Sequence, residues 1–191
     1  MNNIIDFQQK SRTENLTGQT LFSKMLEGEA PHTLIIACSD PYSMPRSLDN
    51  LTGKCSLIIQ NPGALVPPYG SGNSEFLCNL NYSIEHFLVK NIVVIGHNSC
   101  MFLKSVLEAD YINHKNFAWI KEIVQESGAE DDHIGRALVF HSCRNLLEYP
   151  MLSTGVSRPG LNVYGWYYAS EINNVDFVYE LEKLDECFIF Q

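Results

Sequence analysis

Residues 91–100 read NIVVIGHNSC, an apolar run that leads into a histidine and, three residues later, a cysteine. The run is apolar on both faces and rich in β-branched residues, which is typical of a strand buried in a parallel sheet. Residues 33–38, TLIIAC, have the same form and end in Cys38. The carboxyl ends of neighbouring parallel strands meet at one edge of a sheet, where ligand sites form. If the two strands are neighbours, the sequence predicts that Cys38, His97 and Cys100 converge at that edge.

Two thiolates and one imidazole are a good ligand set for zinc. Three protein ligands with an open fourth position are typical of catalytic zinc, which brings the pKa of bound water to about 7. A lone His-x-x-Cys is weak evidence, however, and the alternative is a hydrogen-bonded histidine beside small buried cysteines. The remaining cysteines have no ligand-like partner at motif spacing and are interpreted as structural: Cys55, Cys78, Cys143 and Cys187.

Short apolar runs alternate with helix-like stretches along the rest of the chain. Strands are predicted at 33–38, 56–60, 91–96, 136–141 and 161–167. Helices are predicted at 14–27, 73–88, 100–108, 115–126, 142–149 and 175–184. Helices that lie between short apolar strands indicate an α/β fold with a central, mostly parallel β-sheet flanked by helices. No linker divides the 191 residues, so a single domain over 1–191 is predicted.

Composition excludes several classes of partner. The formal net charge is -9, which disfavours nonspecific binding to nucleic acid or to an anionic membrane. The longest aliphatic run, 92–95, is far too short to span a bilayer. The first twenty residues lack a basic start followed by an apolar stretch, so we expect a cytoplasmic protein without a signal peptide.

The sequence resembles the β-class carbonic anhydrases over nearly its whole length. Four stretches carry the resemblance, in the family's order: APHTLIIACSD at 30–40, LTGKCSLIIQNPGALVPP at 51–68, LNYSIEHFLVKNIVVIGHNSC at 80–100 and NLLEYPMLSTGVSRPGLNVYGWYY at 145–168. The resemblance implies zinc on Cys38, His97 and Cys100 and reversible hydration of CO₂ to bicarbonate by zinc-bound hydroxide, which Asp40 orients. It also implies a homodimer or a dimer of dimers, in which an N-terminal helical arm over 1–27 wraps the partner subunit.

The chain departs from the family motif Cys-x-Asp-Ser-Arg at Tyr42. At this position the family has an arginine that forms an ion pair with the aspartate. An uncharged phenol cannot replace the bidentate fork of a guanidinium. Asp40 then has two alternatives. It becomes a fourth zinc ligand that closes the site, or Arg46 reaches back as a substitute partner. We favour the interpretation of Arg46 as a solvated loop cation.

Other departures surround the predicted metal. Glutamine, proline, alanine and methionine replace the family's arginine, alanine, asparagine and glycine at Gln60, Pro62, Ala64 and Met101. Residues that surround metal ligands tune a site strongly, so reduced or altered activity is expected. Two alternatives stay open: a hydrolase of another small electrophile, and a catalytically silent relative that binds zinc or bicarbonate and acts through protein contacts.

Overall fold

The computed structural model describes residues 33–41, 43, 56–87, 89–108, 118–127, 131–153, 161–169 and 174–181. Several sequence-based predictions fall outside these residues. They are the helix at 14–27, the N-terminal arm over 1–27, and the positions of Tyr42 and Arg46. The fold and the site are therefore built from the described segments.

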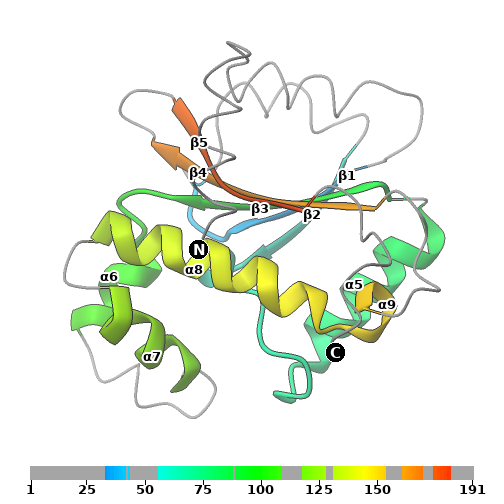
Figure 1. The fold of residues 1–191 in the computed structure, drawn as a ribbon, viewed down its shortest axis with the longest axis horizontal. Helices are drawn as coiled ribbons and strands as arrows, with labels where there is room; N and C mark the ends of the chain where they lie inside the picture. The colour runs from blue at the N-terminus through cyan, green and yellow to red at the C-terminus, as the bar shows by residue number, and fades with distance from the viewer. Residues whose placement is uncertain are drawn as a thin grey trace, which may run out of the picture.

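A five-stranded sheet in the order β2-β1-β3-β4-β5 forms the centre of the molecule (Figure 1). Its strands are β1 Thr33–Cys38, β2 Ser56–Asn61, β3 Asn91–His97, β4 Asn162–Ala169 and β5 Asn174–Leu181. The first four strands are parallel to one another, and β5 joins the edge antiparallel to β4. The prediction of a mostly parallel sheet is confirmed, as are four of its predicted strands.

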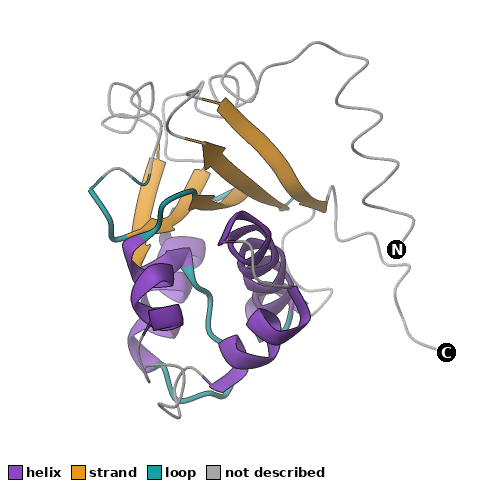
Figure 2. Cartoon of the chain, turned by 90° about the vertical axis from the view of Figure 1, so that its left-hand side faces the viewer, coloured by secondary structure: helices purple, strands orange, loops and turns teal. Residues whose placement is uncertain are grey.

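The helices of the described residues all lie on one face of the sheet, as Figures 1 and 2 show from two directions. They are the 3₁₀ turn η1 Pro62–Ala64, α5 Ser74–His86, α6 Met101–Glu108, α7 Ala118–Ser127, α8 Asp131–Leu147 and α9 Pro150–Ser153. The start of α5 is capped by Asn73, whose side chain accepts a hydrogen bond from the backbone of Phe76 (3.1 Å). Within the described segments, every helix is too short or too polar to cross a membrane.

Both faces of the central strands are buried, which explains why their sequences do not alternate between apolar and polar residues. Leu34 and Ile36 of β1 belong to the large core cluster that packs beneath the helices. Ile35 and Ala37 belong to a second apolar cluster on the opposite face. All four side chains are fully buried.

The predicted strand at 136–141 is wrong, because these residues form the middle of α8. The run RALVFH is apolar, and a short apolar run does not distinguish a strand from a buried helix. The helical period becomes visible only over a longer window, where Ile134, Leu138, Ser142 and Leu146 recur every fourth residue and are all buried. The helix predicted at 142–149 is the second half of this same helix, which ends at Leu147.

The predicted helix at 175–184 is also wrong, since Asn174–Leu181 is the edge strand β5. Apolar residues occupy alternate positions at Val175, Phe177, Tyr179 and Leu181, with Asp176 and Glu180 between them. This two-residue period is typical of a half-buried strand. Backbone pairing with β4 therefore prevails over the weak helical pattern of the same stretch.

Candidate metal centre

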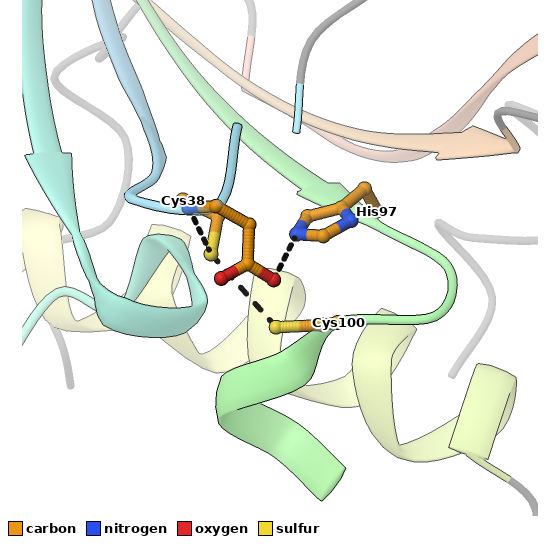
Figure 3. Close-up of side chains that lie close together, drawn as sticks. Cys38, His97 and Cys100 are labelled. Carbon is orange, nitrogen blue, oxygen red and sulfur yellow. Dashed lines mark hydrogen bonds and ion pairs between the residues drawn. The ribbon is translucent and has the colours of Figure 1, made fainter. Parts of the chain in front are cut away.

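Four potential metal ligands converge where β1 and β3 end (Figure 3). The register pairs Ala37 with Ile95, so the next residues of both strands reach the same edge of the sheet. There, one ligand atom from each of Cys38, Asp40, His97 and Cys100 lies within 4.8 Å of the other three. The structure thus brings together the three predicted zinc ligands and the aspartate that follows the first of them.

The Cys38 sulfur is the centre of a hydrogen-bond cluster. It accepts from the backbone N–H of Asp40 (3.4 Å) and of Gly63 (3.2 Å), and it lies 3.8 Å from the Cys100 sulfur. The hydrogen bond with Cys100 is the main cause that lowers the pKa of Cys38 to about 4, against the effect of burial. The same hydrogen bond raises the pKa of Cys100 well above its ordinary value. Ionisation of one thiol of the pair is therefore favoured by the hydrogen bond from the other, which in turn resists ionisation.

The His97 ring is oriented by its own turn. Nδ1 lies 2.9 Å from the carbonyl oxygen of Asn98, and this contact requires the ring to donate its Nδ1 proton. Burial lowers the pKa of His97, but the Cys38 thiolate, the Asn98 carbonyl and the Asp40 carboxylate outweigh that effect, and the net pKa is raised. Nε2 is buried and makes no hydrogen bond to any described residue. A ring nitrogen fixed in this way is typical of a histidine whose second nitrogen binds a metal.

Asp40 points into the same space. Its Oδ2 accepts a hydrogen bond from the backbone N–H of Met101 (2.8 Å), the first residue of α6, and lies 3.5 Å from Nε2 of His97. A helix N-terminus favours negative charge through its free N–H groups. The backbone of α6 therefore contacts the Asp40 carboxylate. The corresponding aspartate of the family motif pairs with an arginine.

Sequence reasoning missed the donors that come from the main chain. The amides of Gly63 and Met101 were not singled out, because a backbone N–H is present whatever the side chain. Ser43 was missed as well; it is buried, and its hydroxyl donates to the Cys38 carbonyl (2.8 Å), which closes the turn after β1. The one available signal was Gly63 itself, since a glycine in a tight turn allows a close backbone approach.

The structure places the described residues of the predicted pocket in different environments. Gln60 is exposed near the end of β2, whereas Ala64 is fully buried in the core beneath the helices. The Met101 side chain is 67% exposed, and its backbone N–H contacts Asp40 at the site. Tyr42 and Arg46 lie outside the described residues, and their expected roles stay predictions.

The donor set suits zinc. Two sulfurs and an imidazole nitrogen are the ligands that zinc prefers, and a carboxylate completes a tetrahedral set. The buried Nε2 of His97, without a hydrogen bond in the described part of the chain, faces the thiolate of Cys38 and the carboxylate of Asp40. A divalent cation bound here would coordinate Nε2 of His97 and neutralise the negative charge of the Cys38 sulfur and the Asp40 carboxylate.

Comparison with known proteins identifies the family of the chain. The family model described as carbonic anhydrase matches residues 33–175. "Beta carbonic anhydrase 5, chloroplastic" of Arabidopsis thaliana is 27% identical over 86% of this chain, which spans 58% of that protein. A carbonic anhydrase of Synechococcus elongatus is 26% identical over 87% of this chain and 68% of its own length. A tetrameric β-carbonic anhydrase from Sordaria macrospora has the same fold, with a TM-score of 0.67, 19% identity and 94% of each chain covered. From its sequence match and its fold, the chain belongs to the β-class carbonic anhydrase family.

Proposed function

We propose that this chain is a zinc-dependent carbonic anhydrase-like protein that interconverts CO₂ and bicarbonate, with lower activity at neutral pH than the family motif implies. The observation that carries the proposal is the convergence of four ligand atoms, from Cys38, Asp40, His97 and Cys100, within 4.8 Å of one another around the buried Nε2 of His97. Membership of the family supports the choice of substrate.

Cys38, His97 and Cys100 would hold the metal, and the first two are each fixed by backbone groups. The amides of Asp40 and Gly63 hold the Cys38 sulfur, and the Asn98 carbonyl holds the His97 ring. Bound zinc supplies a Lewis acid that lowers the pKa of water. The part of Asp40 is to accept a proton and to orient the attacking oxygen, with its own carboxylate fixed by the Met101 amide.

The same position of Asp40 is the reason to expect low activity. Its carboxylate accepts the Met101 backbone N–H at the ligand cluster and lies 3.5 Å from Nε2 of His97. As a fourth ligand it would compete with water. A higher hydroxide concentration opposes this competition, so activity is expected to rise from pH 7 to pH 9.

Metal analysis and stopped-flow CO₂ hydration on zinc-loaded protein test the proposal. We expect one zinc per chain, weak hydration at pH 7, and a rise toward pH 9. His97→Ala should abolish both metal and activity. His86→Ala, at the exposed end of α5, is the matched control and should change neither. Absence of hydration at every pH, with zinc bound, would contradict the proposed activity.

A second candidate is favoured by the same aspartate: a catalytically silent relative that binds zinc, with Asp40 permanently closing the site. Hydration by the zinc-loaded wild type at pH 9 separates the two, because a permanently closed site stays inactive there. The double variant Pro41→Ser, Tyr42→Arg then tests the cause: it restores the arginine of the family motif and should raise hydration if Asp40 is what limits it. Unchanged hydration in a zinc-loaded double variant would exclude Asp40 as the limiting group.

We further propose that the protein is a cytoplasmic single-domain subunit of a homodimer or a dimer of dimers. The tetramer named for the Sordaria macrospora structures supports the larger assembly. Sedimentation of the full chain at several concentrations tests this point, and a monomer throughout the range would contradict it.

A further inference from the structure

Segment 61–67, which follows β2, contacts the candidate metal centre at one end and α8 at the other. Near its start, the Gly63 amide donates to the Cys38 sulfur at 3.2 Å. Near its end, the backbone of Val66 and Pro67 is hydrogen-bonded to side chains from α8 and the turn that follows it. We define these three side chains, Ser142, Asn145 and Tyr149, as the α8 clamp.

The clamp satisfies three consecutive backbone groups of the segment. The Val66 N–H donates to the Ser142 hydroxyl (3.1 Å), and the Asn145 amide donates to the Val66 carbonyl (2.8 Å). The Tyr149 hydroxyl donates to the Pro67 carbonyl (2.9 Å). Val66 is buried and belongs to no strand, so its N–H and C=O are satisfied by these side chains rather than by a strand partner.

The turn between the clamp and the sulfur has an unfavourable backbone. Gly63 has φ +67 and Ala64 has φ +55, so two consecutive residues lie in the left-handed region. Such a conformation costs about 1–2 kcal/mol for a residue with a Cβ, here Ala64, and persists only where surrounding contacts impose it. On the strand side, the amide of Ser39 donates to the Asn61 carbonyl (3.2 Å). On the other side, only Leu65 separates the turn from Val66, the first residue that the clamp holds.

We propose that Ser142, Asn145 and Tyr149 are positioning residues for the metal centre: by fixing Val66 and Pro67, they hold the Gly63 amide on the Cys38 sulfur. This inference rests on the proposed zinc site. An N–H that donates to a ligating thiolate limits its movement and tunes its binding to the metal. The clamp thus acts on the metal without contacting any of its ligands.

Removing the clamp would lower stability even if its role were purely structural. The test therefore measures the Gly63 amide itself rather than stability alone. Ser142→Ala and Asn145→Ala each remove one hydrogen bond to Val66, and Tyr149→Phe removes a hydroxyl while keeping the ring. Ser83→Ala is the matched control, because this buried hydroxyl donates only within α5, to the Asn79 carbonyl (2.8 Å).

Two measurements are made on each folded variant: the ¹H–¹⁵N resonance of the Gly63 amide, with and without zinc, and the zinc affinity by competition with a chromophoric chelator. We expect the clamp variants to shift the Gly63 amide proton upfield and to weaken zinc affinity about three- to tenfold. That loss is at or below the low end of the 10–100-fold cost of changing a residue that touches a metal ligand. Ser83→Ala should change neither quantity.

The inference is overturned if the clamp variants lose stability but keep the Gly63 resonance and a zinc affinity within twofold of the Ser83→Ala control. Tyr149→Phe, the mildest change, keeps the test decisive if the alanine variants do not fold. If only the proposed activity is wrong, the result is different. The wild type then shows no CO₂ hydration, but the clamp variants still change the Gly63 resonance and the zinc affinity. A wild-type chain that binds no zinc would overturn both.

Discussion

Replacing Asp40 by asparagine keeps the shape of the side chain and removes its charge. The amide oxygen of asparagine can still accept the Met101 N–H, which lies 2.8 Å from Oδ2 in the wild type. A hydrogen bond to a charged group contributes about 1.5–3 kcal/mol, and one between neutral groups about 0.5–1.5 kcal/mol. The free energy of unfolding of the zinc-free chain should therefore fall by about 1 kcal/mol from the weaker Met101 hydrogen bond, while loss of the attraction to His97 and relief of repulsion from the Cys38 sulfur act in opposite directions.

Zinc affinity should respond more strongly than stability. A neutral amide is a poor zinc ligand, and Oδ2 lies only 3.5 Å from the His97 nitrogen that faces the site. We expect zinc to bind 10–100-fold more weakly in Asp40→Asn, a change of about 1.4–2.7 kcal/mol. Asp132→Asn is the matched control, because it makes the same exchange at the acceptor of the Tyr167 hydroxyl.

Cobalt substitution shows whether the fourth position is closed. With Asp40 as a ligand, the visible spectrum of the cobalt-loaded wild type should not change on addition of azide, since no ligand is free to exchange. In Asp40→Asn the same addition should shift the spectrum. The reasoning is refuted if azide already shifts the wild-type spectrum, or if the variant binds zinc within twofold of the wild type.

Three further results are expected. Cys100→Ser should lose the bound zinc and, in thermal unfolding, behave like chelator-treated wild type; undiminished metal content would exclude Cys100 as a ligand. Zinc affinity should increase with pH, because the raised pKa values of His97 and Cys100 mean that both release protons on binding, as calorimetry in buffers of different protonation enthalpy can measure. Gly96→Ala should lower the free energy of unfolding in urea by about 1–3 kcal/mol, since its Cβ would overlap the Val139 side chain of α8; a loss below 0.5 kcal/mol would show that strand and helix separate freely.

The sequence predicted the convergence at the sheet edge because strand ends and ligand types are both local patterns. Each run, 33–38 and 91–96, is apolar on both faces, and a shared edge follows once the strands are parallel. The pairing of β1 with β3 confirms that step. What the sequence could not supply is the main-chain part of the site, the amides of Gly63 and Met101, since their direction depends on how η1 and α6 pack.

The two wrong assignments have one cause, which is competition between periods. The short, mostly apolar run 136–141 is compatible with a strand. Over the longer stretch from Ile134 to Leu146, however, every fourth residue is buried, which is the period of a helix. In 175–184, the alternation from Val175 to Leu181 belongs to a strand, although the same stretch also carries a weak helical pattern. Partners elsewhere in the fold decide between such patterns: β3 and β4 pack against α8, and β4 pairs with β5.

Cys38 and Cys100 are 62 residues apart in the sequence, yet their sulfurs lie 3.8 Å apart. In the proposed site, one zinc ion shared by both sulfurs is a removable cross-link that closes a loop of this length. Restricting the unfolded chain in this way is worth about 4 kcal/mol by the chain-entropy relation for covalent cross-links. If zinc stays bound in urea, the loop remains closed and the denatured chain is more compact. The zinc-loaded protein would then unfold with a shallower dependence on urea than the zinc-free protein.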